Sequence, residues 1–251
     1  MDNLLQFEIY KFLFVFLRVG SAFIFMPGFQ SAYVPAQIRL IAAVTISLVL
    51  LPFLSSSLPN PPADFLQVVK ICLIELTYGV FIGMVMFTLF SALNLVGNFA
   101  GQAIGFANAQ IFDPNTQNQS LLIEVFLTIT ALTVVFITDL HHLMINGVVD
   151  SYNIFPAGSP LPVDDLSKFF SETVNQSFIM GFKVASPFIA FMIVFYTGLG
   201  LVTRLMPQLN IFFLSLPLQI YLGLGLLLIT VPIMVFWALK YFEDGIMQFV
   251  S

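Results

Sequence analysis

The sequence predicts an all-α integral membrane protein. Of its 251 residues, 59% are hydrophobic and only 8% are charged, whereas soluble domains carry about 25% charged residues. Five stretches carry no charge at all: 19–38, 41–63, 76–112, 184–203 and 205–239. Because a membrane-spanning helix needs about 20 mostly apolar residues, these stretches have room for five to six helices.

Turn-forming residues separate the predicted helices, which we place near 10–27, 36–54, 66–96, 119–146, 176–205 and 211–239. The intervening loops are rich in Pro, Gly, Ser and Asn, which favour turns. Two uncharged runs, 76–112 and 205–239, exceed one span, so they must tilt, bend or lie in protein. We therefore expect long, partly kinked helices that pair as hairpins. No loop is long enough to form a separate domain, which predicts a single domain over 1–251.

The charges indicate a membrane topology and exclude one class of partner. A net charge of −5 does not provide the basic surface that nucleic acid requires. A count of basic residues in a six-helix arrangement favours a cytoplasmic location for both ends. In this arrangement one side of the membrane carries Lys11, Lys70, Lys168 and Lys240, and the other side carries Arg39 and Arg204. The first residues, Met-Asp-Asn, lack the basic start of a cleaved signal peptide.

Three glycines recur at every fourth position in the uncharged segment 76–112. Gly97, Gly101 and Gly105 share one helical ridge. Small residues at this spacing let another helix backbone approach closely in a membrane. The ridge therefore predicts tight helix packing.

A polar ridge runs beside these glycines and consists of Asn94, Asn98 and Gln102. Amide side chains are costly in lipid unless they are paired or wetted. Hydrogen bonding between helices and a face on a water-filled lumen both satisfy this requirement. Both interpretations exclude a simple lipid-facing span.

The segment 105–119 begins apolar, ends polar and is broken by Asp113-Pro114. Proline disfavours helix at the preceding residue, and irregular backbone at membrane depth needs surrounding protein or water. Gly105 is suited to a hinge, and Phe106, Ile111 and Phe112 are suited to an apolar seal. A loop that lines or plugs a pore and an ordinary surface connection are the two interpretations.

Arg18 is isolated between the apolar stretches 12–17 and 19–26. A charge inside a membrane helix is by default a candidate functional residue. A structural ion pair and a side chain that reaches the membrane surface are the alternatives. Arg204 is the second candidate for a buried charge.

No pattern for catalysis or for a cofactor is present in the sequence. The phosphate-binding loop G-x-x-x-x-G-K-[ST], the zinc motif H-E-x-x-H and the nucleophile motif G-x-S-x-G are all missing. His141 and His142 follow Asp139 closely, but no Cys or further His completes a metal site. We therefore expect neither an enzyme nor a bound cofactor or metal.

Several stretches, in their order along the chain, resemble the R-type subunit family of the type III export gate, called FliR in flagella and SctT in virulence secretion. They are 18–28 (RVGSAFIFMPG), 34–39 (VPAQIR), 101–105 (GQAIG) leading to Asp113-Pro114, His141-His142 with 151–156 (SYNIFP), 204–213 (RLMPQLNIFF) and 216–218 (LPL). The resemblance covers about the whole chain, and R-x-x-P-Q-x-N is its most specific part. It favours the flagellar system over the virulence injectisome.

The resemblance implies a chain similar to a P-type and a Q-type subunit fused in series. One copy would close a helical assembly with FliP-like and FliQ-like subunits at the bacterial inner membrane, within the flagellar basal body. FlhB-like and FlhA-like components would be further partners, and unfolded flagellar proteins the cargo. The family's plug loop matches 105–119. A small-solute secondary transporter is the alternative, but it would require two related halves with broken helices, which the sequence does not display.

Overall fold

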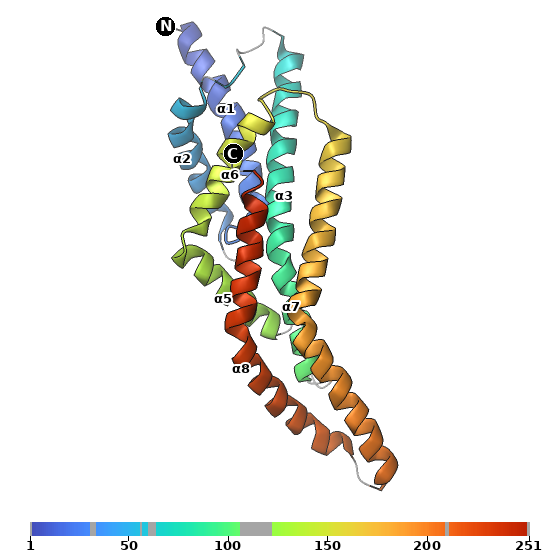
Figure 1. The fold of residues 1–251 in the computed structure, drawn as a ribbon. Coiled ribbons are helices and arrows are strands. Elements are labelled where there is room, and N and C mark those ends of the chain that lie inside the picture. The colour runs from blue at the N-terminus through green and yellow to red at the C-terminus, as the bar shows by residue number, and fades with distance from the viewer. Residues whose placement is uncertain are drawn as a thin grey trace. The chain divides into compact units, whose positions relative to one another are not determined.

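The computed structural model describes residues 2–30, 34–55, 57–59, 64–105, 122–208 and 211–249. In this part of the chain every regular element is a helix (Figure 1). They are α1 (Asp2–Phe25), α2 (Ala36–Leu54), α3 (Phe65–Ile104), α5 (Leu122–Ile137), α6 (Leu140–Ile154), α7 (Val163–Leu205) and α8 (Ile211–Ile246). The predicted all-α class is confirmed.

Among the described residues, four helices are long and apolar enough to cross a membrane: α2, α3, α7 and the Ser215–Ile246 part of α8. The bent pair formed by α5 and α6 makes a fifth if it counts as one span. Helix α1 is not among them, since every 18-residue stretch of it contains Glu8, Lys11 and Arg18. The chain is thus a multi-pass membrane protein by the length and composition of its helices.

The helices differ from the expected boundaries mainly at their polar ends. Helix α2 has the bounds predicted for 36–54, whereas the helix expected at 66–96 continues to Ile104. The helix expected at 10–27 begins at Asp2, and the one expected at 176–205 begins at Val163. The helix expected at 211–239 ends at Ile246. The start of α7 carries Asp164 and Asp165 in its first turn, where acidic side chains are stabilised by the helix dipole. Hydrophobicity alone does not reveal such extensions.

The continuous helix predicted at 119–146 is wrong, because the chain breaks between α5 and α6 at Thr138–Asp139. Asp139 adopts the left-handed conformation with φ 60°, which ends one helix before the next begins. Asp is one of the few residues other than Gly that visit this region. No Gly or Pro marks the break, so the apolar pattern conceals it.

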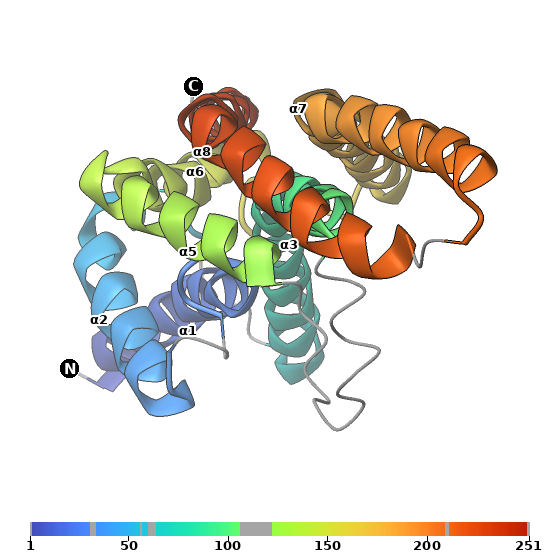
Figure 2. The same ribbon diagram turned by 90° about the horizontal axis from the view of Figure 1, so that it is seen from below.

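The described residues pack as two compact units. The first comprises 1–89, 135–174 and 242–251. Helix α2 lies along α1 in two views (Figures 1 and 2), and Phe14, Phe23 and Met86 lie at most 1% exposed in its core. Near the end of the chain, Phe249 packs edge-on against Phe169 at 5.4 Å.

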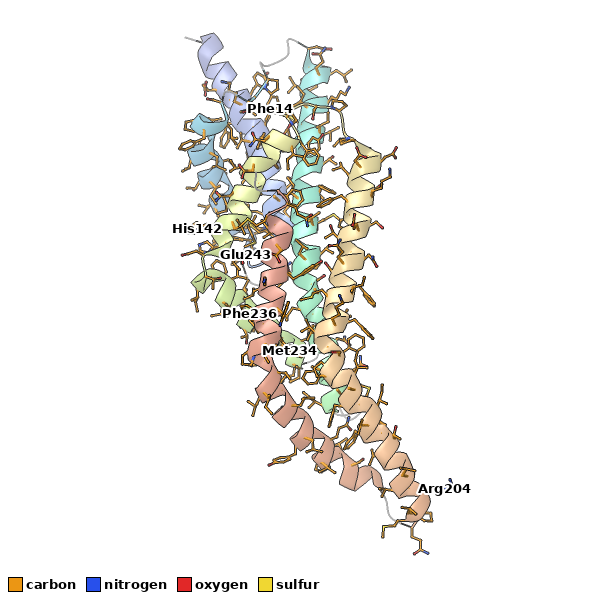
Figure 3. All side chains as sticks on the ribbon, in the orientation of Figure 1. Phe14, His142, Arg204, Met234, Phe236 and Glu243 are labelled. Carbon is orange, nitrogen blue, oxygen red and sulfur yellow. The ribbon has the colours of Figure 1, made fainter. Side chains whose placement is uncertain are left out.

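The second unit comprises 90–134 and 175–241. Its interior includes Leu127, Phe188 and Met234, each at most 2% exposed. Its helices also present large apolar side chains outward: Leu228 is 79% exposed and Phe236, labelled on α8 in Figure 3, is 62% exposed. Because α3, α7 and α8 each contribute to both units, the single domain stays a prediction.

Candidate functional site

Arg18 of α1 and Glu75 of α3 form a fully buried ion pair. The Nε of Arg18 donates to Oε2 of Glu75 at 2.7 Å, and both side chains are 0% exposed. An ion pair removed from water is stable only when further hydrogen bonds satisfy both groups. The surroundings of the pair supply several of these bonds.

Helix α6 and the connection that follows it supply the additional partners. The Nη1 of Arg18 donates to Ser151 Oγ at 3.3 Å and to the Phe155 carbonyl at 3.0 Å. The Gly158 N–H donates to Oε1 of Glu75 at 3.0 Å. One ion pair therefore joins α1, α3, α6 and the start of the loop before α7.

Two tyrosine rings enclose the guanidinium of Arg18. Its Cζ lies 3.8 Å from the ring centroid of Tyr152 and 5.0 Å from that of Tyr78, which is within range of a cation–π interaction. The Arg18 Nη2 and the Tyr152 hydroxyl have no hydrogen-bond partner within the part of the chain that the structure describes. Of the interpretations of Arg18, this geometry matches a structural ion pair.

Glycines let α3 contact its neighbours through the backbone. A Cβ added at Gly97 would lie 2.5 Å from the Cα of Glu124 in α5, and one at Gly83 would lie 2.6 Å from the Ala22 carbonyl of α1. No L side chain fits these gaps without moving a helix. Gly101, the middle residue of the predicted ridge, is also buried.

The third glycine of the ridge ends α3. Gly105 has φ 89°, a conformation that glycine adopts at little cost. A Cβ there would lie 3.0 Å from the side chain of Gln219 in α8. Gly105 is therefore constrained both by its backbone conformation and by its neighbour.

Gln219 holds this end of α3 in place. It is only 2% exposed, and its Nε2 donates to the Ala103 carbonyl at 2.9 Å and to Tyr196 Oη at 3.3 Å. The last carbonyls of a helix lack partners within the helix, and Gln219 satisfies one of them. The sequence analysis missed this residue, although an amide inside an apolar run was a usable signal.

The polar ridge makes hydrogen bonds inside the chain. Thr128 of α5 donates to Asn94 Oδ1 at 2.9 Å, and Gln102 Nε2 donates to Asn98 Oδ1. Asn94 is thus paired across helices, whereas the exposed Gln102 bonds within α3. The first contact fits the interhelical interpretation of the ridge, and the exposed end of the ridge leaves the lumen interpretation open.

The remaining predicted residues lie elsewhere. Phe106, Ile111, Phe112, Asp113 and Pro114 of the predicted plug fall outside the described residues. Arg204 is exposed at the end of α7, where Figure 3 places its side chain away from the helices. Within the single chain the expectation of a buried Arg204 is therefore corrected, because a basic side chain in a last helical turn extends favourably toward water.

The break between α5 and α6 brings together three groups that can ligate metal. One ligand atom from each of Asp139, His141 and His142 lies within 4.8 Å of the others, and Asp139 and His142 are exposed. These residues could hold a divalent ion, although the expectation was that no metal binds.

Comparison with known proteins identifies the family. Residues 9–245 match the family described as "Bacterial export proteins, family 1". The chain belongs to this family. Among individual proteins, the flagellar biosynthetic protein FliR of Caulobacter vibrioides is 35% identical over 94% of this chain and 95% of its own length.

More distant relatives have the same name as the Caulobacter protein. The flagellar biosynthetic protein FliR of Bacillus subtilis is 27% identical over 88% of the chain and 86% of its own length. The flagellar biosynthetic protein FliR of Escherichia coli K12 is 23% identical over 86% of the chain and 82% of its own length. The likeness thus extends over nearly the full length of each export protein compared.

Proposed function

We propose that this export-family protein is a channel-forming subunit of the flagellar type III export gate, which helps unfolded flagellar subunits cross the bacterial inner membrane. The observation that carries the proposal is the 35% identity over 94% of the chain with a flagellar biosynthetic protein FliR. Because the likeness extends over nearly the full length of both chains, the proposal concerns the whole chain.

The proposal includes FliP-like and FliQ-like partner subunits, with FlhB-like and FlhA-like components beside them. Support comes from the apolar surface of the single chain. Only 17% of the most apolar stretch of α7 and 33% of that of α8 are buried. Lipid or other subunits must cover this surface, and an assembly of several membrane proteins offers such cover.

We further propose that 105–119 plugs the passage. The support is at its N-terminal end, where the left-handed Gly105 follows α3 and Gln219 holds the last turn of that helix. A loop that is anchored firmly at one end can move aside and return to the same place. Passage of a chain through such a channel requires no catalytic group. The buried Arg18–Glu75 pair is accordingly assigned a structural role, since its partners belong to the same chain.

The proposal is tested in the organism that encodes the chain. Deletion of the gene should abolish motility and secretion of hook and filament proteins, and a plasmid copy should restore both. A tagged copy should co-purify with P-type and Q-type membrane subunits in one particle. Retained motility with lost virulence secretion would indicate the injectisome instead, and a conducting, monodisperse single subunit would contradict the proposal.

A further inference from the structure

An apolar groove of about 510 Å³ lies beside α1, α2 and α3 in the first unit. Phe16, Gly20 and Ile24 line it from α1, Leu40 and Ala43 from α2, and Leu76 from α3. Its volume falls within the roughly 300–1,000 Å³ of typical ligand pockets. The groove is open, since Ile24 is 48% and Leu40 is 57% exposed, so a long apolar molecule can enter from the side.

Among the described residues that line the groove, Arg39 is the single charged side chain. It is half-buried, and no ion pair or hydrogen bond to its guanidinium occurs within the described ranges. Arg18, by contrast, donates through Nε to Glu75 and through Nη1 to Ser151 and Phe155. A guanidinium with five donors and no acceptor nearby is suited to an anionic ligand.

The position of Arg39 along α2 indicates which anion it meets. Helix α2 is a candidate membrane span from Ala36 to Leu54, and Arg39 lies in its first turn. The cation therefore lies at the end of an apolar segment, and at the end of a helix that crosses a bilayer such a side chain reaches the depth of the lipid phosphates. Arg binds phosphate with two parallel hydrogen bonds, and Gln37 beside it adds amide donors.

We propose that the groove binds one phospholipid, with an acyl chain along Phe16, Gly20 and Leu40 and the phosphate on Arg39 and Gln37. The apolar lining and the unpaired cation at its edge are complementary to the two parts of such a lipid. This site is additional to the proposed export function and rests only on the groove and on the membrane character of α2.

The test is photo-cross-linking in membranes of cells that produce the full chain. The probe is phosphatidylglycerol with a photoreactive diazirine in one acyl chain, compared with diacylglycerol that carries the same group but no phosphate. Adducts of the first probe should map to the lining residues of α1 and α2. The diacylglycerol should label them weakly, because it lacks the phosphate.

Two variants test the two parts of the site. Arg39→Gln should lower labelling by phosphatidylglycerol about tenfold, the usual scale for losing a charged hydrogen bond, and should leave labelling by diacylglycerol unchanged. Gly20→Leu should abolish labelling by both probes. A Cβ at Gly20 meets Phe16 and Ala43 at ordinary distances of 3.7–3.9 Å, so the new side chain fits and fills the groove.

Arg204→Gln is the matched control, because it removes an exposed arginine from the end of α7 and should not alter labelling of α1 and α2. If Gly20→Leu does not fold, Leu40→Trp fills the groove from an exposed position instead. Equal labelling of α7, α8 and the groove would indicate bulk lipid and overturn the site. The site would also be overturned if the lipid probe formed no adduct with the groove residues and labelled a partner subunit instead.

Discussion

Arg18 and Glu75 are 57 residues apart in sequence, yet the Nε of one and the Oε2 of the other lie 2.7 Å apart with no exposed surface on either side chain. The pair joins α1 to α3, and its remaining hydrogen bonds reach Ser151, Phe155 and Gly158. One long-range contact thus positions several helices of the first unit.

Removal of one partner of this pair should be strongly destabilising. Arg18→Met leaves the carboxylate of Glu75 buried without its cation, and Glu75→Leu leaves the guanidinium unpaired. Each should lower the free energy of unfolding by about 3–5 kcal/mol, measured by circular dichroism of the detergent-solubilised chain in rising SDS. Arg204→Met, at an exposed position, should change it little.

The double variant Arg18→Met/Glu75→Leu separates lost packing from an unpaired charge. It should be more stable than either single variant, because no charge remains buried alone. If the two single effects add, the ion pair is not the dominant contribution, and the cation–π contacts of Arg18 with Tyr78 and Tyr152 gain weight.

Enlargement of Gly97 should separate α3 from α5. A Cβ at this position would already lie 2.5 Å from the Cα of Glu124, so Gly97→Leu requires a backbone shift. Overpacking typically costs about 1–3 kcal/mol, measurable by the same SDS titration, and the yield of assembled complex should fall before expression does. Gly198→Leu is the control, because a Cβ at Gly198 has nothing within 4 Å. Equal stability of the two variants would contradict the close approach.

Loss of Gln219 should loosen the end of α3. Gln219→Leu removes the donor to the Ala103 carbonyl and leaves that buried acceptor unsatisfied, at a cost of about 1–3 kcal/mol. Amide hydrogen exchange should rise in the last turn of α3, near Gly105. The exposed Gln102 provides the control Gln102→Leu, which breaks only a hydrogen bond within α3. Unchanged exchange in Gln219→Leu would mean that other contacts hold this end.

The proposed plug predicts a leak. Replacement of Phe106, Ile111 and Phe112 together by Ala removes the apolar side chains proposed to seal the passage, so ions and small solutes should cross. Leakage of a small solute from cells that overproduce the whole assembly measures the effect, while protein export persists because the plug must move aside during export. Normal assembly without leakage would make 105–119 a plain connector.

The sequence predicted the fold class well because that class depends on composition. Low charge and long apolar runs indicate membrane helices regardless of how those helices meet. The pairing of Arg18 with Glu75 could not be predicted in the same way, since each residue sits alone in an apolar stretch and several other charges were available. Similarly, the spacing of Gly97, Gly101 and Gly105 indicates a close approach but not that α5 is the neighbour at Gly97.

Two features depend on contacts or backbone geometry that the local sequence does not specify. The left-handed Asp139 interrupts an apolar run without Gly or Pro nearby, so hydrophobicity predicts one helix where two exist. Gln219 acts on the Ala103 carbonyl, 116 residues away, and only the folded chain brings them together. Contacts of this kind depend on packing geometry, which residue types alone do not determine.

The composition of the first unit has a consequence for biosynthesis. It combines residues 1–89 with the final segment 242–251, and Phe242 and Ile246 are at most 1% exposed. Ribosomes add about 5–20 residues per second, so the first helices wait on the order of 10–30 s for that segment. Throughout this interval the core of the first unit stays incomplete. A message truncated before Phe242 would yield N-terminal helices that lack the residues needed to complete their core.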